Sequence, residues 1–525
     1  MQRWYCLALL FCAALSLTTA AAERPNIVYI LCDDLGYGDV KALNPQGKIA
    51  TPNMDRLAAA GMAFTDCHSS SAVCSPTRYG VLTGRYNWRS RLKKGVLGGY
   101  SPRLIEDGRL TVASFLKQRG YATAAIGKWH LGMDFPLKGG GIARDYADEA
   151  NVDFGKPIAN GPTAVGFDYY FGISASLDMP PYTFIENDRV IANPTGHQEK
   201  WGNVRAGAKA PDFVFDRVLP TVTAKAIEWI DHHAADARSG KQPLFLYLPL
   251  NAPHTPIVPT QDWQGKSGLN AYGDYVMETD WAVGQVLQAI DKAGLTDSTL
   301  LVMTSDNGCS PQANFPELLA KGHNPSYVSR GYKADIYDGG HHIPFFVRWP
   351  GHIKPGSTTG QIACLTDFFA TVAEVIGEKL PDAAAEDSVS LLPVLTNPAL
   401  DKPLREAIVH HSIDGCFAIR QGNWKLELCP GSGGWSAPRD PAAFREGLPA
   451  IQLYDMGADV AEKNNVQSAN PAIVERLTKL LEKYVSEGRS TAGAPQENTT
   501  PVNIYAGPEA SRQAAQSAAP KRKKK

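Results

Sequence analysis

The stretch NIVYILCDDLG, residues 26–36, joins a short apolar run to two adjacent acids. Such a run is typical of a strand buried on both faces of a parallel sheet. Four similar runs follow along the chain, at residues 122–126, 244–250, 299–304 and 345–349. Helical patterns occupy the intervals, at residues 52–60, 111–119, 218–232 and 275–293. This alternation predicts an α/β fold in which helices sandwich a large, mostly parallel sheet.

The alternating pattern continues to about residue 400 without a clear linker, so we predict one large domain over residues 23–400. Beyond it, shorter patterns indicate antiparallel strands at 417–419, 424–428 and 451–454 and a closing amphipathic helix at 471–485. They predict a smaller α+β subdomain over residues 401–488. Residues 489–525 turn to Ala, Gln, Ser, Pro and Thr without periodicity, which predicts a disordered tail with a basic end.

The N-terminus has the pattern of an export signal. Arg3 precedes an apolar run, Cys6–Leu17, and the small residues Ala20–Ala22 offer a cleavage site. We therefore predict a signal peptide over residues 1–22. The apolar run is too short to span a bilayer, and bulky residues before Cys12 disfavour a lipoprotein anchor. We expect an exported protein, periplasmic or extracellular, with no transmembrane segment in the mature chain.

Composition and charge exclude several classes of protein. Hydrophobic residues make up 44% and charged residues 20%, which excludes a wholly disordered chain, a collagen-like repeat and a coiled coil. The 52 Lys and Arg residues balance 53 Asp and Glu residues, so we expect no nucleic-acid partner. The basic end, Lys521 to Lys525, is either a solvated terminus or a weak contact to polyanions.

Seven of the nine cysteines follow the predicted signal peptide. In an exported protein an odd number leaves at least one thiol unpaired or chemically used. The spacing of Cys416 and Cys429 suits a small disulfide loop, but sequence alone does not fix pairing. Cys74 is the candidate for the unpaired thiol.

Polar residues stand directly after four of the predicted strands. In strand order they are Asp33 and Asp34, then Lys128 and His130, then Asn251 and His254, then Asp306 and Asn307. Ligands of open α/β sheets bind beyond the carboxyl ends of the strands. We therefore expect these side chains at one edge, in one active site.

The oxygens of Asp33, Asp34, Asp306 and Asn307 suit a hard cation such as calcium or magnesium rather than zinc. Adjacent acids repel each other, so Asp33 and Asp34 need either a cation or exposure to solvent. The alternative is a pair of turn or capping residues. The matching position of Asp306 and Asn307 favours the metal.

The run CSPTR, residues 74–78, suits the start of a helix because Pro76 fits the first turn. Cys74 would then lie at a helix N-terminus, where the dipole and free amides favour anions. Arg78 would follow on the same face, one turn later. The alternative is a buried structural cysteine.

With LTGR at residues 82–85, the CSPTR run resembles the signature of type I sulfatases, in the alkaline-phosphatase-like superfamily. The resemblance covers about residues 25–485. It implies that a formylglycine-generating or equivalent maturation enzyme oxidises Cys74 to formylglycine. Of the two hydroxyls of the aldehyde hydrate, one attacks sulfur and the other allows the sulfate to be released. The resemblance further implies one Ca²⁺, bound by Asp33, Asp34, Cys74, Asp306 and Asn307.

The same resemblance assigns roles around a bound sulfate. It matches the cationic residues of the family with Arg78, Lys128 and Lys333. His254 would protonate the leaving oxygen, and His130 would take a proton as the sulfate is released. Ser176 matches a polar residue that lines the pocket. From the residues themselves, Asp178, Glu186 and Arg330 are candidates for substrate contacts, together with Tyr182 and the loop around Trp435.

The chain departs from the family pattern after Asp338-Gly339-Gly340, where a basic residue is common and His341-His342 stands instead. The pairs His232-His233 and His410-His411 are expected to be solvated. No second set of metal-binding histidines of the two-zinc phosphatase kind is evident, which weakens that alternative.

These observations predict an exported, calcium-dependent sulfatase that acts on a sulfated carbohydrate, a polysaccharide or glycosaminoglycan fragment. A phosphodiester or phosphonate-ester hydrolase on the same scaffold is the rival enzyme, but a Cys rather than Ser or Thr at the nucleophile favours the sulfatase. An inactive carbohydrate-binding homologue is the other rival, and the intact catalytic set argues against it.

Overall fold

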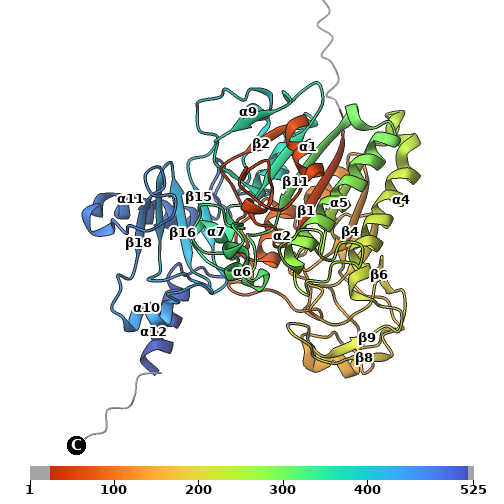
Figure 1. The fold of residues 1–525 in the computed structure, drawn as a ribbon, viewed down its shortest axis with the longest axis horizontal. Coiled ribbons are helices and arrows are strands. Elements are labelled where there is room, and N and C mark those ends of the chain that lie inside the picture. Colours follow the sequence, from red (N-terminus) through yellow and green to blue (C-terminus); the bar gives the residue numbers. More distant parts are fainter. Residues whose placement is uncertain (1–23, 518–525) are drawn as a thin grey trace, which may run out of the picture.

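A computed structural model describes residues 24–517, and its centre is a ten-stranded mixed sheet (Figure 1). The five neighbouring parallel strands are β11 Thr299–Ser305, β1 Asn26–Cys32, β10 Leu244–Pro249, β4 Ala122–Lys128 and β5 Tyr169–Ile173. Beyond β11 lie β12 Phe345–Arg348, β2 Met62–Phe64 and β13 Ser357–Thr359; beyond β5 lie β6 Ile185–Glu186 and β7 Arg189–Val190. The predicted α/β class and all five predicted strands are confirmed.

The large sheet is buried on both faces because successive side chains of a strand point to opposite sides. Ile27, Tyr29 and Leu31 of β1 lie in one hydrophobic core, whereas Val28 and Ile30 lie in the other. Burying such a side chain contributes about 1.5–3 kcal/mol each. This accounts for the continuous apolar run that marks β1 in the sequence.

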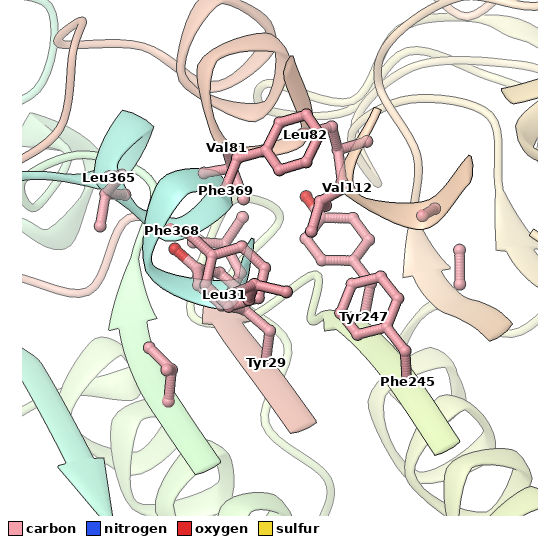
Figure 2. Packing of buried hydrophobic residues seen from close by; sticks show 14 of the residues in the cluster. Tyr29, Leu31, Val81, Leu82, Val112, Phe245, Tyr247, Leu365, Phe368 and Phe369 are labelled. Atoms are coloured by element: carbon pink, nitrogen blue, oxygen red, sulfur yellow. The ribbon is translucent and has the colours of Figure 1, made fainter. Parts of the chain in front are cut away.

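Helices cover both faces of the sheet. One face carries α1 Pro52–Ala60, α4 Val218–Arg238 and α5 Ala271–Lys292, and the other carries α2 Cys74–Thr83, α3 Val112–Lys117 and α8 Phe368–Val375. Figure 2 shows the second face, where Tyr29 packs against Phe368 with ring centroids 4.3 Å apart. Val81 and Leu82 of α2 belong to the same core. Apolar packing of its C-terminal half therefore holds the helix that begins at Cys74 against the sheet.

A four-stranded antiparallel sheet forms the C-terminal part of the structure. Its order is β15 Ile408–His411, β16 Phe417–Gln421, β17 Trp424–Glu427 and β18 Gln452–Asp455. The helix α11 Pro471–Ser486 packs on this sheet through Leu477 and Leu481. The predicted short antiparallel sheet and closing helix are confirmed, but β15 was not predicted.

The remaining strands and α-helices are β3 Cys67–His68, β8 Gly196–Gln198, β9 Gly207–Lys209, β14 Ala363–Cys364, α6 Phe315–Ala320, α7 Asp338–His341, α9 Leu392–Thr396, α10 Asp440–Arg445 and α12 Ala506–Ser517.

The tail from residue 489 onward was expected to be disordered, but it makes contacts with the rest of the chain up to residue 517. Arg85 donates hydrogen bonds to the carbonyl of Glu497 (2.7 Å) and the hydroxyl of Thr499 (3.1 Å), and α12 packs against α10. Polar tail residues are ordered here because they satisfy buried groups of the main body. The predicted signal peptide and the basic end lie outside the described residues.

Two further expectations concern the disulfide loop and membrane-spanning helices. Within residues 24–517 all seven cysteines are unpaired, Cys416 and Cys429 included. No helix in that range is both long and apolar enough to cross a membrane.

Both histidine pairs were expected to be exposed to solvent, and this is wrong for one of them. His232 is exposed, but His410 and His411 are buried in β15. Other segments of the chain cover them.

Candidate active site

The acids expected to bind a cation come together because their strands are neighbours. Cys32 of β1 pairs with Ser305 of β11, so Asp33 and Asp306 are the next residues of two adjacent parallel strands. The amide of Asp306 donates to the carbonyl of Cys32 at 3.0 Å. This register places the predicted acids at one edge of the sheet.

Cations from three other elements meet these acids. Lys128, the last residue of β4, donates to Asp33 Oδ2 at 2.6 Å. Lys333, in the loop before α7, lies 2.7 Å from Asp34 Oδ1. Arg78, one turn into α2, donates to Asp306 Oδ2 through Nε at 3.0 Å and through Nη2 at 2.7 Å. The predicted residues therefore form a buried set of three acids and three cations.

The four oxygen-bearing residues fit a bound cation. Asn307 Nδ2 donates to Asp34 Oδ1 at 2.7 Å, and the buried Asn307 Oδ1 has no partner among the described residues. Asp34 adopts a left-handed backbone with φ 65°, which is uncommon for a residue other than glycine and is typical of functional sites. A buried, unpartnered amide oxygen beside three carboxylates is a donor set that suits calcium or magnesium.

Burial and neighbouring charges shift the pKa values of the three carboxyl groups in different directions. Burial raises the pKa of Asp34, and Asp33 adds repulsion that Lys333 offsets in part. Burial, followed by Asp33, likewise raises the pKa of Asp306. Burial also acts on Asp33, but the charge of Lys128 outweighs it and holds the pKa of Asp33 well below its usual range. Asp33 therefore ionises readily, whereas Asp34 and Asp306 resist ionisation unless a further positive charge is bound beside them.

Cys74 begins α2, as the CSPTR run predicts, and its side chain is buried. Its Sγ lies 3.5 Å from Asp33 Oδ1. Burial, and next the charge of Asp306, raises the pKa of the thiol, so the unmodified residue stays protonated at neutral pH. A protonated thiol is a poor nucleophile.

The two predicted histidines line the same cavity as Cys74. His130 Nε2 lies 2.8 Å from the carbonyl of Leu97, which only accepts, so Nδ1 keeps its lone pair. His254 Nδ1 lies 2.6 Å from the carbonyl of Thr255, which leaves Nε2 free, 3.7 Å from Asp34 Oδ2. Burial and then Lys333 lower the pKa of His254 to about 4. Burial, and next the charge of Lys128, also lowers the pKa of His130, so each imidazole is oriented and neutral in the free site.

The cavity has a volume of about 300 Å³ and includes Cys74, His130, His254 and Lys333 in its wall. Ser176 and Asp178 line it as predicted, and so does Trp435. Sequence reasoning missed Asn203, Arg205 and Gln312, which also line it. None of these three follows a strand of the large sheet, so no pattern marked them.

Two predicted substrate contacts lie elsewhere. Glu186 accepts a hydrogen bond from the Tyr169 hydroxyl at 2.7 Å and lines a different hollow, beside His232. Arg330 donates to the carbonyl of Glu462 at 2.8 Å and lies over the ring of Tyr337. Both side chains have structural partners outside the cavity, so their assignment to substrate contacts is corrected.

Tyr182 also has a structural role. It is buried and donates to the carbonyl of Arg205 at 2.6 Å. It therefore supports the cavity wall rather than facing substrate.

Residues 25–378 match the family model described as Sulfatase. The chain belongs to the sulfatase family. This sulfatase is thus a sulfuric ester hydrolase, as its sequence predicted. It is 34% identical over 502 residues to an N-acetylgalactosamine-6-O-sulfatase of Bacteroides thetaiotaomicron, covering 88% of this chain and 93% of that protein.

Two further relatives agree. Arylsulfatase A of Homo sapiens is 32% identical over 489 residues, covering 89% of each chain. A structure solved in work on the metabolism of multiple glycosaminoglycans by Bacteroides thetaiotaomicron superposes with a TM-score of 0.75 at 33% identity, covering 88% of this chain and 99% of that one. The sulfatase therefore shares both sequence and fold with these proteins over nearly its whole length.

Proposed function

We propose that this chain is an exported, calcium-dependent sulfatase that hydrolyses a sulfated carbohydrate after Cys74 has been oxidised to formylglycine. The observation that carries the proposal is the position of Cys74. It begins a helix, borders the set of three acids and three cations, and opens into a cavity with two oriented histidines. When formed, the formylglycine hydrate supplies one hydroxyl to attack sulfur and a second whose deprotonation releases the sulfate.

Calcium would be held by Asp33, Asp34, Asp306 and Asn307, with residue 74 completing the set. When bound, the ion polarises the sulfate oxygens and lowers the pKa of the nucleophilic hydroxyl. The unpartnered Asn307 Oδ1 and the mutual repulsion of the acids support this assignment. Three acids against three cations sum to zero, so one divalent ion would give the site a charge of +2, which favours an anionic sulfate ester.

The three cations have different duties in this proposal. Arg78 is fully buried and donates to Asp306 and to the carbonyl of Lys128, so it acts as a positioning residue. Lys128 pairs with Asp33 in the same way. Lys333 alone of the three lines the cavity, so its ammonium is the one that meets a sulfate oxygen.

The histidines supply the proton transfers. His254 is neutral in the free site, but a bound sulfate anion favours its protonated form, and Nε2 is the nitrogen free to give the proton to the leaving oxygen. His130 Nδ1 keeps its lone pair because Nε2 is committed to Leu97, so it is the base for release of sulfate. Both free nitrogens carry lone pairs in the empty site, and His254 becomes the acid in this proposal because the bound sulfate would favour its protonated form.

The substrate is proposed from the cavity and the relatives. Asp178, Asn203, Arg205 and Gln312 give the wall hydrogen-bonding groups suited to a sugar, and Asp178 Oδ1 is buried without a partner in the described chain. Relatives named for N-acetylgalactosamine-6-sulfate make a 6-O-sulfated hexosamine the first substrate to test. The predicted signal peptide supports export.

The test is a panel of position-defined sulfated mono- and disaccharides, assayed for free sulfate with protein made with and without the maturation enzyme. Mass spectrometry of the Cys74 peptide measures conversion of thiol to aldehyde. We expect sulfate release in proportion to aldehyde content. Faster hydrolysis of a phosphodiester than of every sulfate ester, or full activity with an intact thiol, would contradict the proposal.

A further inference from the structure

A second group of buried side chains lies outside the active site and consists of three histidines. His68 ends β3, His341 ends α7, and His410 lies in β15, so they come from segments far apart in the sequence. All three are fully buried, and one ring nitrogen from each lies within 4.8 Å of the others. We call this group the His68–His341–His410 cluster. It shares no residue with the acids near Cys74.

Hydrogen bonds on the outer side of the cluster fix two of its tautomers. His68 Nε2 lies 2.7 Å from Asp66 Oδ1, and His341 Nε2 lies 2.9 Å from the carbonyl of Ile336. Both partners only accept, so both Nε2 atoms carry hydrogen and both Nδ1 atoms carry lone pairs. Those two Nδ1 atoms face each other at 3.0 Å. Two lone pairs at this distance repel unless a cation or an added proton lies between them.

A second, independent observation concerns the surroundings of His410. Its ring stacks on His341 with centroids 3.8 Å apart, yet neither of its nitrogens has a hydrogen-bond partner among residues 24–517. A buried polar group without a partner destabilises the folded state. One of these nitrogens lies within 4.8 Å of a nitrogen of each of the other two rings, so a single bound ion is within reach of all three side chains.

The charge around the cluster also favours a cation. Lys425 lies within 3.4 Å of His341 Nε2, but it contacts three buried acids, Asp338, Glu427 and Glu462. On the other side Arg420 pairs with Asp66. The acids beside the cluster therefore outnumber the bases by four to two.

We propose that the cluster is a binding site for a transition-metal ion, with zinc as the expected occupant. His68 Nδ1 and His341 Nδ1, which already face each other, would be two of the ligands, and one nitrogen of His410 would be the third once its ring turns out of the stack on His341. Imidazole suits zinc, copper and nickel rather than calcium. Ligands of tetrahedral zinc at 2.0–2.1 Å lie about 3.3 Å apart, close to the Nδ1 separation here. Outer hydrogen bonds from ligating histidines to a carboxylate and a carbonyl are the usual support of such sites.

The position of the site indicates a structural role. The residues after His68 lead directly to Cys74, and in that segment the amide of Ser69 donates to the carbonyl of His341, and the amide of Ala72 to that of His411. In Figure 1, α7 lies beside β15 and β16. A metal here would fasten the C-terminal sheet to the segment that carries Cys74.

The test uses the full-length protein, purified after growth with zinc and measured for metals by elemental analysis. The variants are His341→Asn and His410→Asn. His411→Asn is the matched control, because His411 is buried on the same strand but its Nδ1 faces Asn87 at 3.3 Å instead of the cluster. We expect about one zinc per chain in wild type and control, and a loss of at least tenfold in both cluster variants.

Titration of the chelated protein with Co²⁺ gives a readout independent of activity. Visible absorption typical of low-coordinate Co²⁺ should develop in wild type and control but not in the cluster variants. A hundredfold excess of zinc over its Kd should raise the melting temperature by about 3 °C.

If a variant fails to fold, X-ray absorption by zinc in the wild-type protein still tests the proposal. Imidazole scattering in the zinc X-ray absorption spectrum would support the proposal. Sulfur scattering would place the ion on Cys416 and Cys429, which group with Asp440, and would overturn it. Zinc-free protein with no Co²⁺ spectrum would also overturn it, and would mean that an added proton joins the two Nδ1 atoms.

Discussion

Cys74 is buried beside Asp33, and burial raises the pKa of its thiol, so the residue encoded by the gene is not itself an effective nucleophile. Replacement by Ser conserves size and one hydroxyl but lacks the second hydroxyl needed to release sulfate. We expect Cys74→Ser and Cys74→Ala to lose multiple turnover while keeping the wild-type melting temperature within about 2 °C. Sulfate release and thermal unfolding are the measurements. Sustained turnover by Cys74→Ser near the wild-type rate would refute the formylglycine assignment.

His254 permits a prediction that depends on the leaving group. A sugar alkoxide must be protonated as it leaves, whereas a nitrophenolate need not be. His254→Ala should therefore slow hydrolysis of the sugar sulfate by about 10²–10⁴-fold and that of 4-nitrophenyl sulfate by far less. Parallel assays of kcat with both esters check this. Equal losses on both esters would remove His254 from the role of acid.

His130 should behave differently because its proposed step follows departure of the alcohol. His130→Ala should slow the sugar and aryl esters to a similar limiting rate, with a burst of nitrophenol in the first turnover. Stopped-flow measurement with the aryl sulfate checks this. Ser176, 3.5 Å from His130 Nδ1, offers a milder matched variant, Ser176→Ala. A strong preference for one leaving group in His130→Ala would contradict the role of base.

Sequence reasoning worked best for residues at strand ends, because the register of parallel strands turns sequence position into spatial position. Asp33 and Asp306 met as predicted. Glu186 and Arg330 did not reach the cavity, since the direction of a side chain on a short edge strand or loop depends on distant partners such as Tyr169 and Glu462. Arg205 was missed for the same reason.

At the scale of the elements, the ends of β1 and β11 and the start of α2 form one charged unit. Asp306→Ala leaves Arg78 buried without its closest carboxylate, and breaking a buried ion pair costs about 3–5 kcal/mol. We expect this variant to lose activity and to melt at a clearly lower temperature. Thermal unfolding with a sulfate-release assay checks both effects. Wild-type stability would show that Arg78 does not depend on Asp306.

A second prediction for this charged unit concerns the calcium ion that its acids would bind. Dialysis against a calcium-selective chelator should abolish activity and lower the melting temperature, and added calcium should restore both. Elemental analysis must confirm that the protein is metal-free. Full activity in such protein would exclude the metal from the reaction.

Among the elements, apolar runs identified five strands of the ten-stranded sheet, because each is buried on both faces, but they missed β5 of its parallel core. The run at 345–349 did not reveal that β12 is antiparallel to β11, since burial carries no information on strand direction. The strand β15 was missed because it ends in two histidines, which resemble a solvated pair. His410 is covered by His68 and His341, which are far away in the chain.

At the scale of the whole molecule, the tail closes over the second half of the motif at residues 74–85. Arg85 is fully buried and bonds to Glu497 and Thr499, and Arg89 donates to Asn498 Oδ1 at 3.0 Å. Composition alone predicted disorder here, because the gain from satisfying buried guanidinium groups is invisible in a polar, aperiodic segment. The tail and the helix that begins at Cys74 are therefore parts of one folded unit.

A chain that ends at Gly488 tests this unit. It would leave two buried guanidinium groups without several of their hydrogen bonds, each worth about 1.5–3 kcal/mol when the donor is charged. We expect a loss of at least about 3 kcal/mol in the free energy of unfolding, and activity that fails at lower temperature than in wild type. A chain that ends at Ser517 keeps every contact described here and is the matched control. Denaturant unfolding of both chains decides, because equal midpoints would mean that water replaces the tail at Arg85 and Arg89 without cost.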